Sequence, residues 1–358
     1  MTFARISGLG QWFPETVRRN ADWPDSFVEH SIARQGDRIL VDIPTAGGDR
    51  IPAIIRRHLD NEAGDPFLGA RERRIADPSV TSSQAEANAA QAALADAGLD
   101  AAEVDAIFSW AILPDRPMPS NACRVGDLIG ATRAWGATVD LACASPVGQL
   151  ALAAALVESG RARHVLLTQS HLLMKAFPMS HPASPSVGDG AAALVVSAAP
   201  ERGVLGTHSV SHGAYFDSVV WARGRDDASD APWWEAGGDF QLASRDPDGA
   251  KHLVQETVRM GVQTVNELLD SEGVGIDEIS TFVSVQPRRW VPHAIAEALG
   301  LPQGAAVETF QTYGHLGGTG PVVNLLASRQ APADRADGLT LMYAQGAGFT
   351  RSAALLRL

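Results

Sequence analysis

The sequence predicts an α/β protein built from two similar halves. Apolar runs typical of buried strands alternate with Ala- and Leu-rich runs typical of helices, and one segment recurs 175 residues further along the chain. A polar, Gly- and Pro-containing segment at 20–65 is expected to form loops and short helices. The regular elements expected in chain order are strand 3–10 entering a turn at Gly8–Gly10, helix 82–97, strand 105–113, helix 121–129, helix 147–159, strand 165–170 and strand 192–197.

The repeat relates residues 97–108 to residues 272–283, an offset of 175 (272 − 97 = 175). The same offset takes Pro146 to Pro321 (321 − 146 = 175), so helix 321–328 is expected to be the counterpart of the helix that follows Pro146. Two such halves pack about a pseudo-twofold axis with these helices side by side. The loops that precede the two helices are then expected to meet at one place.

Cys143 lies at the corner between a buried strand and a buried helix. The helix is mostly Ala, Leu and Val, it tolerates Pro146 in its first turn, and Gly160 ends it. The unpaired N–H groups and positive dipole end of a helix N-terminus favour an anion, so a thiol held there is expected to ionise more easily and to act as a nucleophile. The alternative is a small buried cysteine in a helix cap.

His315 lies in the Gly-rich loop 313–320, directly before Pro321. If the two elbows converge, His315 approaches Cys143, and a Cys–His pair is the minimum arrangement for an activated thiol nucleophile. The alternative is an ordinary loop histidine. Six other histidines show no metal-ligand spacing and are interpreted as structural or surface groups, so no metal site is expected; they are His171, His181, His208, His212, His252 and His293.

The composition excludes several classes of partner. The net charge is −12 and the pI about 5.3, which argues against nonspecific nucleic-acid binding and against an anionic membrane surface. The two cysteines, Cys123 and Cys143, do not suggest a disulfide framework. The first residues lack the pattern of a signal peptide and no apolar run approaches membrane-spanning length, so a cytoplasmic protein is expected.

Several short motifs together resemble the thiolase superfamily, specifically β-ketoacyl-acyl-carrier-protein synthase III and its relatives. The motifs are Arg71-Glu-Arg-Arg-Ile-Ala76, Met118-Pro-Ser120 followed by Cys123, Asp140-Leu-Ala-Cys143, Gly188-Asp-Gly-Ala191 and Gly346-Ala-Gly-Phe-Thr350. The resemblance implies a thiolase-like, five-layered αβαβα fold with an N-terminal half at 1–200 and a C-terminal half at 201–358. It also implies an obligate homodimer in which the Met118 loop lines the partner's pocket.

The chain departs from the family pattern at its catalytic positions. Val285 stands where the condensing enzymes carry a His, and it has no donor for an enolate oxygen. Gln286 falls on the family's Gln, and a slip in register would let it serve as the donor. His315 stands at the family's Asn position, as in degradative thiolases, where a His acts as base toward the Cys. Met118 replaces the Glu of head-to-head condensing relatives.

Three further features carry expectations from the resemblance. The backbone N–H of Ala347 is expected to join that of Cys143 in holding an oxyanion; the alternative is a Gly-rich turn. The triplet Arg288-Arg289-Trp290 is at the family's tunnel mouth, where it is expected to bind phosphate of coenzyme A or of phosphopantetheine, or else to be a solvated basic turn. The pair Trp233-Trp234 lies in the long polar stretch 223–249, a candidate lid or surface loop.

The resulting expectation is thioester acyl transfer. Cys143 takes an acyl group from an acyl-CoA or acyl-carrier-protein donor and His315 acts as the base. The acyl group then passes to a small-molecule alcohol, amine or thiol, in natural-product or polyketide biosynthesis. No permanently bound cofactor is expected. A carbon–carbon condensing ketosynthase and a catalytically silent partner subunit of a ketosynthase are the two alternatives.

Overall fold

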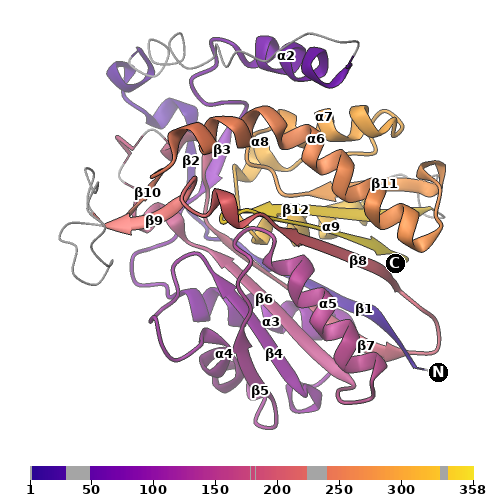
Figure 1. Ribbon diagram of the computed structural model, residues 1–358. Coiled ribbons are helices and arrows are strands. Elements are labelled where there is room, and N and C mark those ends of the chain that lie inside the picture. The colour runs from indigo at the N-terminus through magenta and orange to yellow at the C-terminus, as the bar shows by residue number, and fades with distance from the viewer. Residues whose placement is uncertain (1, 30–48, 178, 182, 224–239, 331–337) are drawn as a thin grey trace.

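Two mixed β-sheets form the framework of the protein (Figure 1). The computed structural model describes residues 2–29, 49–177, 179–181, 183–223, 240–330 and 338–358. The first sheet has the order β1-β7-β6-β4-β5, in which β7 is antiparallel to β1 and β6, and β4 is parallel to β6 and β5. Its strands are β1 (Phe3–Trp12), β4 (Ala106–Ala111), β5 (Trp135–Thr138), β6 (His164–His171) and β7 (Gly190–Ala199).

The second sheet repeats this pattern with one strand fewer. Its order is β8-β13-β12-β11, with β13 antiparallel to β8 and β12, and β12 parallel to β11. A single parallel bridge between Phe282 and Ala306 stands where the first sheet has β5. The strands are β8 (Val204–Ser211), β11 (Ile279–Ser284), β12 (Leu339–Gly346) and β13 (Thr350–Leu356). The repeat expected from the 175-residue offset is therefore present in the topology.

Together with the two sheets, a central layer and two outer layers of helices make up five layers. Helices α5 (Ser145–Glu158) and α9 (Thr319–Ser328) contact each other and strands of both sheets, so they form the central layer. Helices α3 (Ser82–Ala97) and α4 (Asn121–Ile129) cover the outer face of the first sheet. On the second sheet the outer layer is α6 (Pro247–Glu272) with α7 (Trp290–Leu299), which α2 (Ile51–Glu62) joins (Figure 1).

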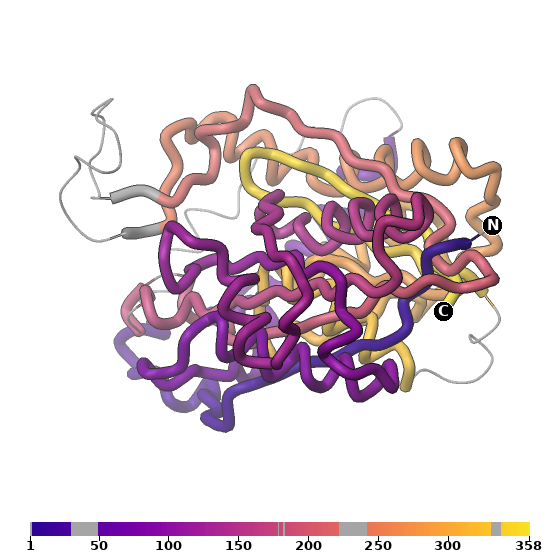
Figure 2. Tube along the Cα trace, turned by 90° about the horizontal axis from the view of Figure 1, so that it is seen from below, coloured from indigo at the N-terminus to yellow at the C-terminus, as the bar shows by residue number. Residues whose placement is uncertain are grey.

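Short elements connect these layers. Helix α8 (Phe310–Tyr313) precedes the His315 loop. Strands β2 (Val17–Arg19) and β3 (Glu72–Arg74) form one two-stranded sheet, and β9 (Val220–Arg223) and β10 (Phe240–Ala243) form another. The described parts of the N- and C-terminal strands, β1 and β13, reach the same side of the molecule (Figure 2). None of the helices in the described ranges is long and apolar enough to cross a membrane.

The long outer helices α3 and α6 end in the same way. Gly98 and Gly273 each adopt φ +66°, a left-handed conformation that only glycine reaches without strain, and each closes its helix. At the other end of α3, Thr81 accepts the backbone N–H of Gln84, while the Gln84 side chain accepts the N–H of Thr81. These local signals explain why the sequence predicted 82–97 to the residue.

A buried carboxylate ties α3 to the first sheet. Glu86 on α3 is fully buried and accepts hydrogen bonds from Ser109 at 2.6 Å, Thr168 at 2.6 Å, Ser170 at 2.9 Å and Asn121 at 3.1 Å. These four donors come from β4, β6 and α4. The carboxylate thereby fixes the ends of two parallel strands relative to the start of α4, which is where the cavity described below begins.

The structure corrects three expectations. The predicted turn at Gly8–Gly10 is wrong, because β1 continues through it to Trp12; a Cβ on Gly8 or Gly10 would stand 2.2 Å from a backbone carbonyl of α3, so these glycines allow close packing instead. Segment 20–65 contains a full helix, α2. The stretch 223–249 includes β10 and the first turn of α6. Trp233 and Trp234 lie outside the described residues.

Candidate active site

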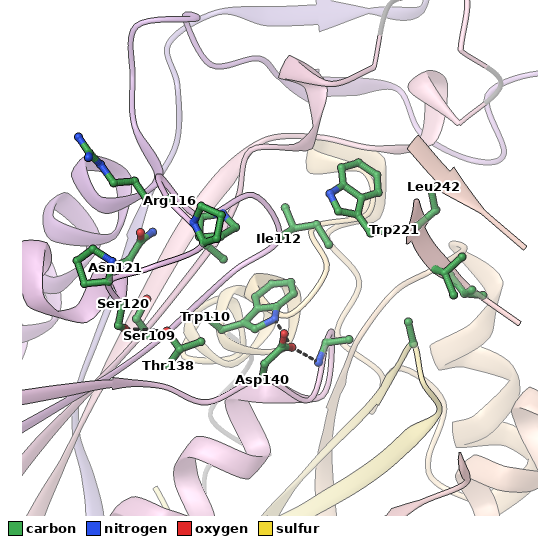
Figure 3. Close-up of a pocket in the computed structure, with 18 residues that line it drawn as sticks. Ser109, Trp110, Ile112, Arg116, Ser120, Asn121, Thr138, Asp140, Trp221 and Leu242 are labelled. Atoms are coloured by element: carbon green, nitrogen blue, oxygen red, sulfur yellow. Dashed lines mark hydrogen bonds between the residues drawn. The ribbon is translucent and has the colours of Figure 1, made fainter. Parts of the chain in front are cut away.

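The turn between β5 and α5 presents Cys143 at the start of the central helix. Asp140 shapes this turn: one of its carboxylate oxygens accepts the backbone N–H of Ala142 at 2.8 Å and the indole N–H of Trp110 at 2.9 Å (Figure 3). Ser145 accepts from the N–H of Leu141 at 2.9 Å and donates to the carbonyl of Ala142 at 2.6 Å. These bonds hold Ala142 at φ +50°, an uncommon conformation for a residue with a side chain.

The Cys143 thiol is harder to ionise than its place beside a helix suggests. Burial, followed by the negative charge of Asp140, raises its pKa to about 12, and a hydrogen bond from its own N–H only partly opposes this. The expectation that the helix N-terminus would favour the thiolate is therefore wrong. The desolvation of the sulfur is the main cause of the raised pKa. At neutral pH Cys143 is therefore a thiol and not a thiolate.

His315 lies in the loop that precedes α9, and backbone bonds hold this loop in place. The His315 N–H donates to the Ser186 carbonyl at 2.7 Å, and the His315 carbonyl accepts from the Gly188 N–H at 3.2 Å. The imidazole Nδ1 lies 3.0 Å from the Gln286 carbonyl, so Nδ1 carries the proton and Nε2 is the basic nitrogen. Burial lowers the pKa of His315 to about 4; the Gln286 bond opposes that shift and the positive charge of Arg288 adds to it.

The two elbows meet, as the repeat predicts. A Cβ on Gly318, three residues after His315, would stand 3.4 Å from the Ala142 carbonyl and 3.0 Å from the ring of Trp110. Leu316 belongs to the same core cluster against which Cys143 packs. With the pKa of the thiol at about 12 and that of the imidazole at about 4, the proton rests on sulfur at neutral pH. In the resting protein Cys143 is therefore a thiol and His315 a neutral imidazole.

The end of β12 packs against the backbone of the Cys143 turn. A Cβ on Gly346 would stand 2.2 Å from the Leu141 carbonyl and 3.0 Å from the backbone nitrogen of Cys143, so only glycine fits at this crossing. Ala347 follows directly and lines the same cavity as Ala142. The backbone N–H groups of Cys143 and Ala347 are thus carried by segments that pack against each other.

A cavity of about 410 Å³ opens beside the elbow (Figure 3). Its lining includes Ala142, Ala347, Trp110, Trp221 and Asp140. The other lining residues come mainly from the end of β4, the loop and helix that follow it, and the β9–β10 hairpin: Ser109, Ala111, Ile112, Pro114, Arg116, Pro117, Pro119, Ser120, Asn121, Thr138, Val219, Val220 and Leu242. Met118 lies in this loop but is 83 % exposed and does not line the cavity.

Val285 and Gln286, which stand at the His and Gln positions of the condensing enzymes, face the interior of the protein. Val285 is 2 % exposed and packs in the apolar core that surrounds the central helices. The Gln286 side chain is 4 % exposed; its amide nitrogen donates to the Val307 carbonyl at 2.7 Å and its oxygen accepts the Thr309 N–H at 3.2 Å. Neither side chain lines the cavity beside Cys143.

The Arg288–Trp290 triplet lies at the entrance to α7, outside the lining of that cavity. Arg288 is exposed, whereas the Arg289 guanidinium lies 3.4 Å from the Glu308 carboxylate. Trp290 is buried and stacks on His58, with 6.2 Å between the ring centroids. The triplet therefore places the exposed Arg288 and the Arg289–Glu308 contact at the start of α7.

Sequence reasoning missed His171. The structure places this residue at the end of β6, 1 % exposed, with its ring centroid 5.5 Å from that of His315. Its position at the carboxyl end of a parallel strand was the available signal, because such ends gather at one edge of a sheet. Among the described residues no group of three or more His, Cys, Asp or Glu side chains is arranged to hold a metal ion.

Comparisons with known proteins agree with this architecture. Residues 138–213 match the family model of 3-oxoacyl-[acyl-carrier-protein] synthase III, and residues 269–358 match the model of its C-terminal part. The β-ketoacyl-[acyl-carrier-protein] synthase III of Clostridium perfringens is 28 % identical over 305 residues, which cover 83 % of this chain and 92 % of the relative.

Two solved structures illustrate the similarity of the fold. The 3-oxoacyl-[acyl-carrier-protein] synthase III of Aquifex aeolicus superposes with a TM-score of 0.77 at 24 % identity, covering 99 % of this chain and 100 % of that one. The priming β-ketosynthase of the R1128 polyketide pathway also gives a TM-score of 0.77, at 23 % identity, covering 99 % of this chain and 96 % of that one. The five layers described above are thus those of the thiolase-like fold.

Proposed function

Because this chain is a β-ketoacyl-acyl-carrier-protein synthase III-like member of the thiolase superfamily, we propose that it transfers an acyl group through an acyl-enzyme on Cys143. Enzymes of this family use acyl-CoA substrates without a permanent cofactor. The donor is accordingly an acyl-CoA or an acyl-carrier-protein thioester, and the acceptor is an alcohol, amine or thiol. The observation that carries the proposal is a base-competent His315 at the elbow, combined with a Val285 that offers no donor.

The first half-reaction moves the acyl group onto sulfur. As the Cys143 sulfur attacks the thioester carbonyl, its proton passes to Nε2 of His315, and the carbonyl oxygen becomes an oxyanion held by the N–H groups of Cys143 and Ala347. Collapse breaks the bond to the donor sulfur. The leaving thiolate takes the proton from His315, which restores the neutral imidazole and leaves the acyl-enzyme.

The second half-reaction uses the same base in the opposite direction. An acceptor O–H, N–H or S–H in the 410 Å³ cavity loses its proton to His315 while its heteroatom attacks the acyl-enzyme carbonyl. The tetrahedral intermediate collapses, the bond to Cys143 breaks, and the proton returns to the sulfur as a thiol. Atoms and charge balance without any further reactant, and the acceptor leaves as an ester, amide or thioester.

The lack of hydrogen-bond donors for an enolate oxygen favours acyl transfer over decarboxylative condensation. Loss of CO2 from a malonyl group produces an enolate, whose oxygen needs hydrogen-bond donors. Val285 has none, and the amide of Gln286 is already bonded to Val307 and Thr309. The basic Nε2 of neutral His315 accepts a proton and cannot donate one. Condensation would therefore have to proceed without the donors that stabilise its intermediate.

The donor and the assembly are part of the same proposal. The exposed Arg288 offers a guanidinium for a phosphate of coenzyme A or of a carrier protein's phosphopantetheine.

Met118 and Trp135 are 83 % and 52 % exposed at the edge of the first sheet formed by strand β5, an apolar surface suited to a second copy of the chain. We place the enzyme as a homodimer in natural-product biosynthesis.

Intact-protein mass spectrometry over a panel of acyl-CoA thioesters tests the proposal. We expect one acyl adduct that maps to Cys143, that is absent from Cys143→Ala, and that persists in the control Cys123→Ala. Small alcohols, amines and thiols are then expected to remove it. No adduct with any thioester would support a silent subunit, and CO2 released from a malonyl thioester together with a lengthened product would support condensation.

A further inference from the structure

Two buried histidines from different halves of the protein contact each other in the interior. His171 ends β6 in the first sheet, and His315 precedes α9 in the second half. Their ring centroids are 5.5 Å apart and the rings are nearly perpendicular, at 74°. Two imidazoles in contact inside a protein are costly if either is charged, so this pair constrains the protonation of both.

Both rings have the same proton arrangement. His171 places Nδ1 2.9 Å from the Gly188 carbonyl, as His315 places Nδ1 3.0 Å from the Gln286 carbonyl. A carbonyl only accepts, so each ring carries its proton on Nδ1 and leaves Nε2 unprotonated. Gly188 also donates its N–H to the His315 carbonyl, which makes this one residue the link between the two histidines.

The edge of His171 supports the loop that carries His315. A Cβ on Gly317 would stand 2.4 Å from Cδ2 and 3.1 Å from Nε2 of His171, and Gly317 itself adopts φ +52°. The loop therefore passes directly over the imidazole edge, at a distance that only glycine allows. Removing the imidazole of His171 would leave the loop without this contact at Gly317, two residues after His315.

We propose that His171 is a positioning residue for acyl transfer, which holds His315 with its basic Nε2 toward Cys143 and without a carboxylate partner. The inference rests on the proposed function, in which His315 is the base. His171 does not line the cavity, and its ring contacts the ring of His315, so its effect is exerted through His315 and the loop that carries it.

The charged groups around the pair are consistent with a neutral base. Arg288, after β11, adds positive charge on the side of His315, and Asp140 faces Cys143 from the elbow. Asp189 follows Gly188, but its carboxylate accepts the N–H groups of Ala76 and Met174. In the part of the chain described here, the hydrogen-bond partner of each imidazole is a backbone carbonyl and not a carboxylate. Burial lowers the pKa of His171 to about 3, with the charge of His315 as a further cause.

The reactivity of Cys143 toward iodoacetamide reports on the base without any substrate. Peptide mass mapping follows alkylation of Cys143 against pH, with Cys123 as the internal reference in every sample. The wild type is expected to show a rate that is nearly independent of pH above about 5, because neutral His315 assists the thiol. His315→Ala is expected to lose this plateau and to rise with pH as the unaided thiol ionises.

His171→Ala and His171→Gln are expected to lower the plateau about ten- to a hundredfold, the usual effect of misplacing a catalytic group by about an ångström. His171→Asp is expected to move the acid limb of the profile to higher pH, because a carboxylate favours the imidazolium form of His315. His171→Ala combined with His315→Ala is expected to be no slower than His315→Ala alone. His164→Gln, at the other end of β6, is the matched control and should leave the profile unchanged.

The outcomes separate this inference from the proposed function. A His315-dependent plateau that survives both His171→Gln and His171→Asp overturns the positioning role and leaves the base intact. A wild-type profile that does not depend on His315 overturns both. Losses from His171→Ala and His315→Ala that add independently also overturn the inference, since they would mean that His171 acts only on folding. Circular dichroism of each variant shows whether it is folded.

Discussion

The Nδ1 of His315 lies 3.0 Å from the backbone carbonyl of Gln286, and this single contact decides which tautomer the ring adopts. The proton stays on Nδ1, so Nε2 is the nitrogen that would accept the thiol proton in the proposed mechanism. A backbone carbonyl also cannot be removed by mutating Gln286, so the tautomer is protected against side-chain changes at that position. The predictions below start from this base.

His315→Ala is expected to slow acylation of Cys143 about a hundred- to ten-thousandfold at neutral pH. The pKa of His315 is lowered to about 4, so the base is neutral and active above that pH and is lost as the pH falls through it. Single-turnover acylation against pH, followed by intact mass, measures both effects. His208→Ala, which pairs with Glu267 away from the elbow, is the control. Near-normal acylation in His315→Ala at pH 7 would show that the base is misassigned.

Val285→His is expected not to create a decarboxylase. Val285 is 2 % exposed in the core, so an imidazole there is overpacked and buried rather than aimed at the cavity, at a cost of about 1–3 kcal/mol in unfolding free energy. The assay measures CO2 released from malonyl-CoA, together with the thermal midpoint of unfolding. Val285→Leu is the apolar control for size. Decarboxylation by Val285→His alone would mean that this position faces the substrate.

Glu86→Gln is expected to destabilise the protein by about 2–4 kcal/mol. Four donors converge on the Glu86 carboxylate, and a Gln in its place would turn a donor toward some of them. Urea unfolding monitored by circular dichroism gives the difference in unfolding free energy. Glu201→Gln, at an exposed site, should change little. Equal unfolding free energies for Glu86→Gln and Glu201→Gln would show that the four hydrogen bonds to the Glu86 carboxylate do not stabilise the fold.

Met118→Asp is expected to convert a dimer into a monomer at micromolar concentration. Met118 is 83 % exposed beside the edge strand β5, and a carboxylate within an apolar interface would have to be desolvated. Light scattering measures the mass in solution. Val254→Asp, a 49 % exposed position on α6, is the matched control. A monomeric wild type would contradict the proposed assembly.

The two central histidines are expected to weaken the fold in acid. Their pKa values are lowered to about 3 and about 4 from an ordinary value near 6.5, so between pH 6.5 and 4 the unfolded chain binds more protons than the folded one. Stability therefore falls as the pH drops through this range, by about 1.4 kcal/mol per pH unit for each histidine. Urea unfolding of His171→Gln should show a slope smaller by about that amount. An unchanged slope would mean that His171 is already charged in the fold.

The sequence predicts the parts of this protein that depend on local signals and on the repeat. Helix 82–97 follows from its caps, and the meeting of the Cys143 and His315 elbows follows from the 175-residue offset. The acidity of Cys143 was predicted wrongly, because the helix position is visible in the sequence whereas burial and the Asp140 charge depend on packing. His171 and Glu86 were missed for a related reason: their partners lie on other elements, and no local spacing reveals them.

The crossing of Gly346 over the elbow has a consequence for how the site forms during folding. Ala142 and Ala347 are 205 residues apart in the chain (347 − 142 = 205), yet they line one cavity. All five strands of the first sheet are complete by residue 199, whereas β12 and β13 come only from residues 339–356. During synthesis the Cys143 turn therefore emerges, and can settle beside its sheet, well before the Ala347 segment exists. In the proposed mechanism the thiol would thus gain the second oxyanion donor only with this late, long-range pairing.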